Sequence, residues 1–438
     1  MKKKIKFLFV FIFLSLGVLF AERQECDENS FIVPLATGVN LVPIYLEPIQ
    51  DLDYSISRDE LDELKRILSF DLNANGGTRI EKKSKPVEYV VTLTIKNKKI
   101  STQITSKTAN WIKELNPLPL FGDLSKDRLQ IHLIADTLYK MLFGKEGIAR
   151  TKILYTVKQK IPDKNEWTSD VWQSDYDGGN ARQLLFDAGY CVTPQYLPTE
   201  KNKKPTHFFY VSYKTGQPKI YLASVKEDEP HRLSMLKGNQ LMPTLSYQRD
   251  KIAFISDVTG NPDLFIQEFS SEKGLIGKPR QIFSAKQAAQ GTPTFSPDGK
   301  KIAFVSNKDG TPRIYVMNIP PEGTKLKDIS PVLINKYRRG CTAPAWSPDG
   351  RKIAYCATID GVRQIFVYDL NLKKEVQLTR GPLDKENPSW APNSLHLAYN
   401  ADGQNQSEMY ILNLNNPEPF KITSGTGEKR FPSWQPEM

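Results

Sequence analysis

The chain has 438 residues, and its 60 lysine and arginine residues against 49 aspartate and glutamate residues give a formal net charge of +11. This length exceeds one ordinary hydrophobic core and indicates two domains. The lysines are scattered along the chain, which argues against a nucleic-acid-binding face. The sequence contains no nucleophile elbow, metalloprotease motif, phosphate loop or dinucleotide fingerprint, and its four histidines are far apart. We therefore expect no enzyme activity, no metal and no cofactor.

Residues 1–21 predict a secretory signal peptide. Four lysines lie among the first six residues, and the apolar stretch that follows ends at the small residue Ala21. Cleavage before Glu22 would remove these four lysines and lower the formal net charge from +11 to +7. A retained membrane anchor is the less favoured alternative, because about 16 apolar residues are short for a bilayer. We expect the mature protein to be soluble and exported.

A polar arm and an α+β domain are predicted next. Residues 22–40 lack hydrophobic periodicity and predict a flexible arm. Residues 41–147 predict a compact domain in the order strand, helix, hairpin, helix. Ser57 begins a capping box for the first helix, Ser125 is the expected cap of the second, and Gly144 ends it. The strands are expected at 41–46, 88–95 and 100–105.

A proline-led phrase recurs six times after residue 190. Its full form begins at Thr292 and reads Thr-Pro-Thr-Phe-Ser-Pro-Asp-Gly-Lys-Lys-Ile-Ala-Phe. The leading prolines, 44 to 51 residues apart, are Pro194, Pro243, Pro293, Pro344, Pro388 and Pro432. Short strands and tight turns at this period are typical of four-stranded β-propeller blades.

The blade count predicts an all-β propeller over residues 148–438. Six second-strand runs are expected, at 153–157, 207–212, 251–256, 301–306, 352–357 and 395–400. The first run has no inner strand before it, and the last proline phrase has no second strand after it. We therefore predict a six-bladed ring in which the C-terminal strand completes the first blade and leaves no open sheet edge.

Repeated residues have mechanical roles in such a blade. The Asp-Gly pairs supply tight turns, where glycine tolerates positive φ. Trp346, Trp390 and Trp434 are expected to fill space between neighbouring blades.

The four cysteines are Cys26, Cys191, Cys341 and Cys356. If Trp346 faces Ile353 in the predicted hairpin, Cys356 lies opposite Ala343, two positions from Cys341. A disulfide between the two cysteines and a pair of free buried thiols are then equal alternatives. Their spacing does not fit a zinc site.

The loops that lead into the inner strands converge at one end of the propeller axis. They are polar with a few apolar residues, which favours a protein-docking surface. The five loops are 237–242, 287–292, 338–342, 384–387 and 428–431. The candidate partner-binding residues are Lys237, Asn239, Gln240, Met242, Gln290, Thr292, Arg338, Thr342, Glu386, Asn387, Arg430 and Phe431.

Four stretches together resemble the TolB family of the Tol–Pal system. They are the helix-to-blade junction from Gln130 to Tyr155, the phrase Ser-Asp-Tyr-Asp-Gly-Gly-Asn-Ala-Arg-Gln-Leu-Leu from Ser174, the Ser-Pro-Asp-Gly repeats, and the terminal Phe-Pro-Ser-Trp-Gln-Pro. The resemblance covers about residues 40–438. It implies an α+β domain followed by a six-bladed propeller.

The resemblance also implies a function. Members of the family are non-enzymatic periplasmic adaptors that dock the peptidoglycan-associated lipoprotein on the propeller mouth and link it to inner-membrane Tol proteins. This coupling supports outer-membrane integrity and invagination during cell division. In the family the mature N-terminus engages the TolA partner. Here the arm 22–40 departs from the usual pattern and contains Cys26.

Two other classes of protein share parts of this pattern. A secreted propeller hydrolase or carbohydrate-binding protein, acting at the central channel, fits the signal peptide and the six blades but not the N-terminal domain. The propeller cap of a serine peptidase would require an α/β-hydrolase domain, and no residues remain to build one.

Overall fold

The computed structural model describes residues 40–436, except 162–165, 187–188, 200–202, 227–228, 271, 337, 405 and 417. The predicted signal peptide, Cys26 and the predicted arm up to residue 39 lie outside the described residues. All described residues belong to the second of two units, Pro34–Met438. Within the described residues, no helix is long and apolar enough to cross a membrane.

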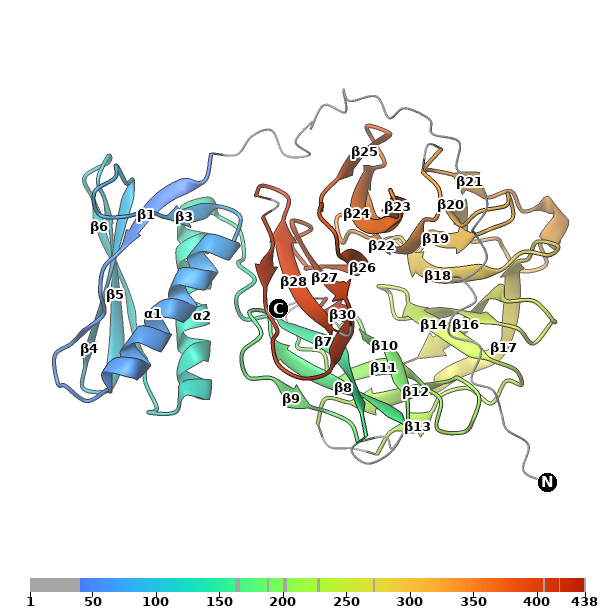
Figure 1. The fold of residues 1–438 in the computed structure, drawn as a ribbon, viewed down its shortest axis with the longest axis horizontal. Coiled ribbons are helices and arrows are strands. Elements are labelled where there is room, and N and C mark those ends of the chain that lie inside the picture. Colours follow the sequence, from blue (N-terminus) through green and yellow to red (C-terminus); the bar gives the residue numbers. More distant parts are fainter. Residues whose placement is uncertain are drawn as a thin grey trace. The chain divides into compact units, whose positions relative to one another are not determined.

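A six-stranded sheet and two helices form the first part of the second unit (Figure 1). The strands follow the order β3-β1-β4-β5-β6, and β2 also pairs with β4. Strand β1 is parallel to both of its neighbours, whereas β4, β5 and β6 are antiparallel. The elements are β1 (Val42–Leu46), β2 (Gln50–Asp51), α1 (Arg58–Ala74), β3 (Thr78–Ile80), β4 (Tyr89–Lys96), β5 (Lys99–Ser106), β6 (Ile112–Pro119) and α2 (Leu124–Phe143).

Local hydrogen bonds explain where the two helices begin and end. The Ser57 hydroxyl accepts the amide hydrogen of Glu60 at 3.3 Å, as the capping box predicts. The prediction that Ser125 caps the second helix is wrong. Asp123 is the cap, and its carboxylate accepts the Ser125 amide hydrogen at 3.0 Å. Gly144 ends α2 with φ of 66°.

Six four-stranded sheets follow, and together they form the predicted six-bladed propeller (Figure 1). Five sheets are continuous in sequence, and the first two are β10 (Cys191–Tyr196), β11 (His207–Ser212), β12 (Lys219–Ser224) and β13 (His231–Arg232), followed by β14 (Gln240–Leu245), β15 (Lys251–Ser256), β16 (Asp263–Ser270) and β17 (Gly274–Phe283). The third sheet is β18 (Gln290–Phe295), β19 (Lys301–Ser306), β20 (Arg313–Asn318) and β21 (Val332–Leu333), with a short 3₁₀ helix (Leu326–Asp328) before β21. The fourth is β22 (Thr342–Trp346), β23 (Lys352–Ile359), β24 (Val362–Asp369) and β25 (Lys374–Gln377), and the fifth is β26 (Asp384–Trp390), β27 (His396–Gly403), β28 (Gln406–Asn413) and β29 (Phe420–Lys421).

The sixth sheet joins the two ends of the ring. Its order is β30-β7-β8-β9, so the inner strand β30 (Glu428–Trp434) pairs antiparallel with β7 (Lys152–Lys160), followed by β8 (Trp167–Asp175) and β9 (Arg182–Gln183). The predicted closure by the C-terminal strand is therefore confirmed. Closure supplies a partner to the edge of β7 that would otherwise remain open.

The repeated Ser-Pro-Asp-Gly phrase builds the turn between the first two strands of a blade. The Ser296 hydroxyl donates to Asp298 Oδ1 at 2.6 Å and accepts the Lys301 amide hydrogen at 2.9 Å. Ser347 repeats both bonds in the next blade. Gly299 has φ of 67°, as its turn position requires. The serine thus ties the two ends of the turn together, a role that the repeat alone does not reveal.

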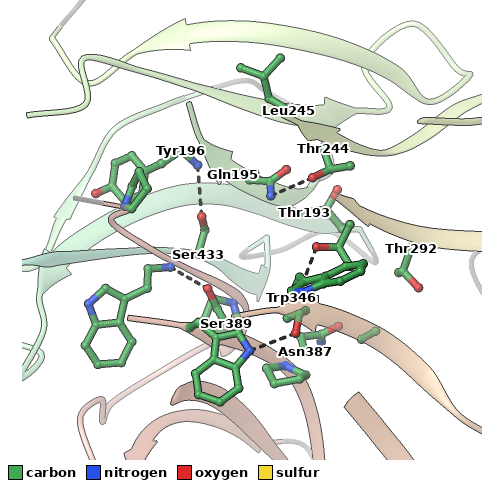
Figure 2. Close-up of a pocket in the computed structure, with 18 of the residues that line it drawn as sticks. Thr193, Gln195, Tyr196, Thr244, Leu245, Thr292, Trp346, Asn387, Ser389 and Ser433 are labelled. Carbon is green, nitrogen blue, oxygen red and sulfur yellow. Dashed lines mark hydrogen bonds between the residues drawn. The ribbon is translucent and has the colours of Figure 1, made fainter. Parts of the chain in front are cut away.

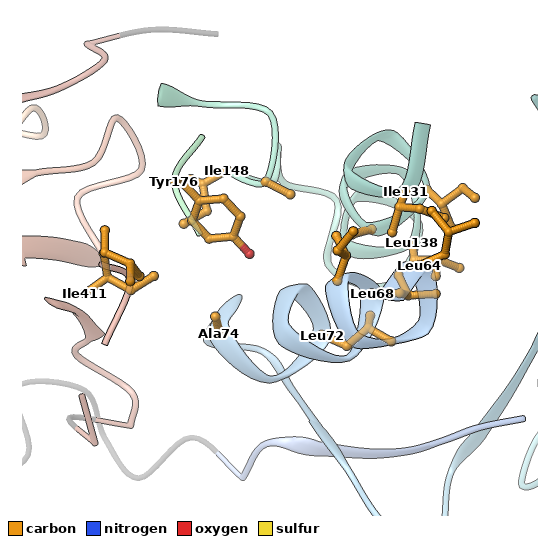
Figure 3. Packing of buried hydrophobic residues seen from close by; sticks show 14 of the residues in the cluster. Leu64, Leu68, Leu72, Ala74, Ile131, Leu138, Ile148, Tyr176 and Ile411 are labelled. Atoms are coloured by element: carbon orange, nitrogen blue, oxygen red, sulfur yellow. The ribbon is translucent and has the colours of Figure 1, made fainter. Parts of the chain in front are cut away.

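One hydrophobic cluster runs from the two helices into the propeller (Figure 3). Leu68 and Leu138 are completely buried where the helices meet, and Tyr176 and Ile411 extend the same cluster into the closing and fifth blades. Burying a large aliphatic side chain is worth about 1.5–3 kcal/mol. The contact between the helices and the propeller is therefore part of a continuous core.

Three described cysteines, Cys191, Cys341 and Cys356, are buried and form no disulfide with one another. Trp346 pairs with Ile353 as expected, but a β-bulge between Thr342 and Ala345 shifts the register. Cys356 consequently lies opposite Thr342 instead of Ala343. Of the two alternatives, the structure contains the free thiols and not the bridge.

Candidate functional site at the propeller mouth

A cavity of 220 Å³ lies on the propeller axis and is lined by the inner strands of all six blades (Figure 2). We call the end of the axis where the loops enter these strands the mouth. The cavity begins at the residues that precede the repeated prolines and extends away from the mouth, as far as Pro198, Tyr247, Pro348 and Pro436 after the inner strands. The lining residues are threonine, serine, asparagine, glutamine, proline, alanine, tyrosine, tryptophan, methionine, leucine and phenylalanine, and none of them carries a charge. The described residues that line the cavity can therefore offer hydrogen bonds and apolar contact.

Six residues with left-handed backbone conformation surround this cavity, one from each inner strand. Each directly precedes one of the repeated prolines. They are Thr193 (φ 49°), Met242 (φ 52°), Thr292 (φ 36°), Ala343 (φ 48°), Asn387 (φ 55°) and Phe431 (φ 56°). Non-glycine residues rarely adopt positive φ, at a cost of about 1–2 kcal/mol each. Such strain is concentrated at functional sites.

The proline repeat explains this ring. In every blade a bulge skips two residues of the inner strand, and the skipped pair is the left-handed residue and its proline. Proline cannot donate to a strand ladder, so the pair leaves the ladder and the strand bends. The side chain before the proline then lines the cavity.

Hydrogen bonds between blades hold the ring together just after the prolines (Figure 2). The hydroxyl of Ser433 accepts the amide hydrogen of Tyr196 at 3.1 Å, and Ser389 accepts that of Trp434 at 2.9 Å. Thr294 accepts the amide hydrogen of Trp346 at 3.3 Å. Ser433 and Ser389 thus fix the positions of the last inner strand against both of its neighbours.

A charged network occupies one arc of the mouth, on the fourth, fifth and closing blades. The Arg363 guanidinium contacts Glu386, and the Arg363 amide donates to Asp384 at 2.7 Å. Arg430 Nη2 lies 3.0 Å from Asp402 and 3.2 Å from Glu428, and Lys158 also contacts Glu428 at 3.3 Å. Burial raises the pKa of Glu386, although Arg363 opposes the shift. The acids of this arc are already paired with basic side chains of the same chain.

Four of the predicted partner-binding residues line the cavity: Met242, Thr292, Asn387 and Phe431. Met242 contacts the neighbouring blade, where its Sδ accepts the Thr292 amide hydrogen at 3.1 Å. The Asn387 amide donates to Asn400 at 2.9 Å. The structure therefore brings together residues from four of the predicted loops.

The other predicted residues lie around this group. Lys237 is exposed, and Arg338 Nε binds Glu375 at 2.8 Å. Thr342 is half-buried, and Glu386 and Arg430 belong to the charged network.

Three predicted residues instead hold the loops in place. The Asn239 amide donates to Asp257 at 2.6 Å. Gln240 and Gln290 are 0% and 2% exposed and donate to loop carbonyls. Their burial means that they can affect a partner only through loop shape.

Of the six left-handed residues that line the cavity, two were not among the predicted site residues: Thr193 and Ala343. They occupy the left-handed position in their blades, and the repeat marks that position in the sequence. The buried Thr193 Oγ1 and Gln195 Oε1 have no hydrogen-bond partner among the described residues. Both residues line the cavity and could donate or accept hydrogen bonds with a ligand.

A second polar cluster lies where the two helices meet the propeller, and we call it the interdomain cluster. The Tyr176 hydroxyl donates to Asp71 Oδ1 at 2.7 Å, and His132 Nδ1 lies 2.8 Å from Asp71 Oδ2. His132 Nε2 lies 3.9 Å from Asp177 Oδ1, and Arg128 also binds Asp177. Burial raises the pKa of Asp71 to about 6. Burial alone would lower the pKa of His132, but Asp71 and Asp177 raise it overall.

This cluster contains the one group of possible metal ligands among the described residues: Asp71, His132 and Asp177. Arg128 already supplies positive charge to Asp177, and a Cβ placed on Gly179 would lie 2.0 Å from Arg128 Nη2. The phrase from Ser174 that contains Asp177 and Gly179 thus joins the two parts of the molecule through ion pairs and hydrogen bonds.

Comparison with known proteins agrees with this architecture. The family model described as the TolB beta propeller domain matches residues 139–438. The TolB homolog of Protochlamydia amoebophila is 51% identical over 407 residues, which cover 87% of this chain and 86% of the relative. The TolB homolog of Chlamydia caviae is 38% identical and covers 86% of each chain. The crystal structure of TolB from Acinetobacter baumannii shares the fold at a TM-score of 0.73 with 22% identity, covering 91% of this chain and 97% of that one. The chain belongs to the TolB family of β-propeller proteins.

Proposed function

We propose that this protein is a periplasmic adaptor that binds the peptidoglycan-associated lipoprotein at the propeller mouth and links it to inner-membrane Tol proteins. Membership of the TolB family, whose proteins act in the Tol–Pal system, supports the general role. The ring of left-handed residues around an uncharged cavity is the observation that carries the proposed docking site. The adaptor would thereby support outer-membrane integrity and invagination at division.

The cavity has the parts that a protein partner requires. Met242 and Phe431 offer apolar contact from inner strands two blades apart in the ring, and Thr193 and Gln195 offer unpaired polar atoms. A few apolar anchors surrounded by polar groups are typical of the centre of a protein interface. The ring is held by hydrogen bonds between blades, so a partner meets a preformed site and loses little entropy on binding.

The channel is a poor catalytic site. A propeller hydrolase or lyase needs an acid, a base or a metal ligand beside its substrate. The described residues that line this cavity include no aspartate, glutamate, histidine, lysine or arginine. This composition, together with a non-enzymatic family, supports an adaptor and disfavours the channel hydrolase.

Binding measurements with the soluble domain of the lipoprotein test the proposal. Phe431→Ala should weaken binding at least tenfold, because the loss of a central aromatic anchor typically costs about 2 kcal/mol or more. Leu372→Ala is the control, since Leu372 is a 64% exposed apolar residue in the turn between β24 and β25, away from the mouth. Unchanged affinity in Phe431→Ala would exclude the mouth as the docking site. Retention of soluble glycans in place of the lipoprotein would favour a carbohydrate-binding channel.

The second partner is assigned to the N-terminal arm. In the family the mature N-terminus engages a TolA-like inner-membrane protein, and we propose the same for residues 22–40. Deletion of residues 22–39 should abolish TolA binding and leave lipoprotein binding unchanged. Equal TolA binding by the shortened protein would place that partner elsewhere.

A further inference from the structure

Large apolar side chains are exposed at the mouth, on the side of the ring formed by the closing, first and second blades. Each blade reaches the mouth twice, at the loop into its inner strand and at the turn between its second and third strands, because its strands are antiparallel. Trp167 at the start of β8 is 49% exposed, Phe186 in the loop into β10 is 84% exposed, and Met235 in the loop into β14 is 80% exposed. Val258, in the turn between β15 and β16, completes this set, which we call the apolar arc. Elsewhere at the mouth, the described residues include one further exposed large apolar side chain, Leu383 in the loop into β26.

Hydrogen bonds join the segment that begins β8 to the loop into β10. The Ser169 amide and the Thr168 hydroxyl both donate to the Gly189 carbonyl at 3.3 Å. The next residue of this loop, Tyr190, packs its ring edge-to-face against Tyr213 in the turn between β11 and β12, with 6.0 Å between the ring centres. The closing blade and the first blade therefore share one stretch of surface at the mouth.

The loop into β14 continues this surface onto the second blade. The Gln240 amide donates to the Pro218 carbonyl, in the turn between β11 and β12, at 3.0 Å. The Asn239 amide donates to Asp257, in the turn between β15 and β16, at 2.7 Å. The loop therefore lies between these two turns, and the apolar arc is continuous over three blades.

The hairpin of the closing blade extends further at the mouth than its equivalent in the second blade. Val157 pairs with Lys429 of the inner strand, and β7 continues for three more residues to Lys160. In the second blade the equivalent of Val157 is Ser256, where β15 ends. Three residues of strand span about 10 Å. Trp167 pairs with Lys160 at the tip of this extension and therefore projects from the mouth.

Lysine side chains accompany the apolar arc. Lys160, Lys214 and Lys237 are exposed in the same three blades, at the mouth ends of their strands or in the loops there. In these mouth segments, Glu166 is the one exposed acid that the structure describes. The described part of this surface therefore combines exposed apolar side chains with a majority of positive charges.

We propose that the apolar arc binds an anionic lipid membrane, with Trp167, Phe186 and Met235 entering its interfacial layer. Tryptophan is enriched at the boundary between lipid and water, because its ring is apolar and its N–H is polar. The Lys158 ammonium lies 4.5 Å from the centre of the Trp167 ring, so a cation accompanies the side chain that projects furthest. Lysine side chains can keep their stems on apolar surface while their ammonium groups reach anionic headgroups. This inference goes beyond the proposed function and does not depend on it.

A membrane suits this arrangement better than a second protein surface. The centre of a protein interface is a compact apolar patch in which lysine is depleted. Here the apolar side chains extend from separate connections of three blades, and lysines lie among them. A fluid lipid interface accepts such separate side chains without a complementary recess. Exposed apolar side chains together with basic ones are typical of binding at a membrane surface.

Vesicle binding by residues 22–438 tests the inference, since the apolar stretch of the predicted signal peptide would itself bind lipid. Vesicles of phosphatidylglycerol and phosphatidylethanolamine supply an anionic surface, and vesicles of phosphatidylcholine supply an uncharged one. The arc variant carries Trp167→Ser, Phe186→Ser and Met235→Ser. The control carries Leu326→Ser, Val332→Ser and Leu372→Ser, three exposed apolar residues in or directly after connections between third and fourth strands, at the opposite end of the blades.

We expect the arc variant to bind anionic vesicles at least about tenfold more weakly, because each large apolar side chain that is fully buried contributes about tenfold or more to partitioning. The control should stay within about threefold of the unmodified chain. Binding should be weaker at high salt and on phosphatidylcholine, since the lysines lose their attraction to anionic headgroups. Thermal melts check that both variants are folded. A second variant, Phe186→Ser with Met235→Ser, leaves the β7–β8 hairpin unchanged and should still lose most of the binding.

Fluorescence identifies the inserted side chain directly. Lipids with brominated acyl chains should quench part of the tryptophan emission when the chain binds, and Trp167→Phe should remove most of this quenching while vesicle binding persists. Unchanged quenching in Trp167→Phe would show that the arc does not enter the lipid.

The proposed function survives a failure of this inference, because the vesicle assays contain no lipoprotein. Absence of vesicle binding by the unmodified chain, or equal binding by folded arc and control variants, would overturn the inference. Self-association without lipid that only the arc variant loses would assign the arc to a second copy of the chain. Loss of lipoprotein binding in the arc variant, with no vesicle binding by the unmodified chain, would assign it to the protein interface.

Discussion

The hydrogen bond between Tyr176 and Asp71 offers a direct measure of how the propeller is held to the N-terminal helices. Both residues are about 1% exposed, and the Tyr176 hydroxyl donates to Asp71 Oδ1 at 2.7 Å. A hydrogen bond to a charged group contributes about 1.5–3 kcal/mol, and removing one partner leaves the other unsatisfied. We therefore expect Tyr176→Phe to lower the free energy of unfolding by about 2–3 kcal/mol at pH 8, where Asp71 is ionised.

A double-mutant cycle isolates this interaction. Urea unfolding of Tyr176→Phe, Asp71→Asn and the double variant should give a coupling energy of about 2 kcal/mol at pH 8. The pKa of Asp71 is about 6, so at pH 5 most of the carboxyl is protonated and the bond joins two neutral groups. The coupling should then fall to about 1 kcal/mol.

Tyr139→Phe is the matched control in the same cluster of helices. Tyr139 is 7% exposed and forms ring contacts with Phe143, but no hydrogen bond of its hydroxyl is present among the described residues. Its loss should change the unfolding free energy by less than about 0.5 kcal/mol. A Tyr176–Asp71 coupling below about 0.5 kcal/mol at pH 8 would refute the reasoning, because that value is expected for residues that do not interact.

Three further predictions follow from the pH dependence, the backbone strain and the buried thiols. Folding raises the pKa of His132, so the stability that His132 contributes is present below pH 6.5 and is lost as pH rises through the raised pKa. Folding also raises the pKa of Asp71, so the protein loses further stability as pH rises from about 4 through 6. Urea unfolding should therefore show stability decreasing toward pH 8, and His132→Gln should reduce this slope; an unchanged slope would exclude the pair as its source. Thr292→Gly should stabilise the protein by about 1 kcal/mol and Asn387→Gly by less, because asparagine tolerates positive φ better than a β-branched residue. A larger gain in melting temperature for Asn387→Gly than for Thr292→Gly would contradict the strain argument. Burial raises the pKa of the Cys341 thiol to about 12, so a thiolate-directed reagent should label Cys341 only after unfolding; rapid labelling of the native protein would show that the site is open.

Most of the propeller could be predicted because each blade repeats the same pattern of strands and turns. The predicted runs at 207–212, 251–256 and 301–306 coincide with β11, β15 and β19. Short strands of alternating apolar and polar residues, bounded by Asp-Gly and Ser-Pro turns, are compatible with few other folds. The closure by β30 followed from counting, since one second strand lacked an inner partner.

The N-terminal sheet shows what the residue pattern did not reveal. Strand β6 (Ile112–Pro119) was not predicted, because it contains two prolines and is mostly exposed. It lies at the edge of the sheet, where a strand needs no apolar face on both sides and proline blocks further pairing. Strand β3 (Thr78–Ile80) has three residues, which is too short for a periodic signal.

The candidate site was only partly predictable for a related reason. The loop positions predicted Met242, Thr292, Asn387 and Phe431, which line the cavity, but loop polarity could not distinguish exposed polar residues from buried ones such as Gln240. The bulge that turns each pre-proline residue into the cavity depends on pairing with a strand elsewhere in the sequence. Such tertiary pairing is not encoded in the composition of a loop.

The closing sheet has a consequence for how the chain matures. The last inner strand and β7 are held by contacts such as that between Lys152 and the Gln435 side chain, 283 residues apart. Until the final strand has been synthesised, β7 has an unsatisfied edge and the ring of sheets is open. Blades in the middle can pair their strands locally as they appear, whereas the blade next to the α+β domain must wait for the whole chain. Removal of Glu428–Trp434 would therefore leave β7 without its inner partner strand. The exposed edge would belong to the blade that packs against the N-terminal helices.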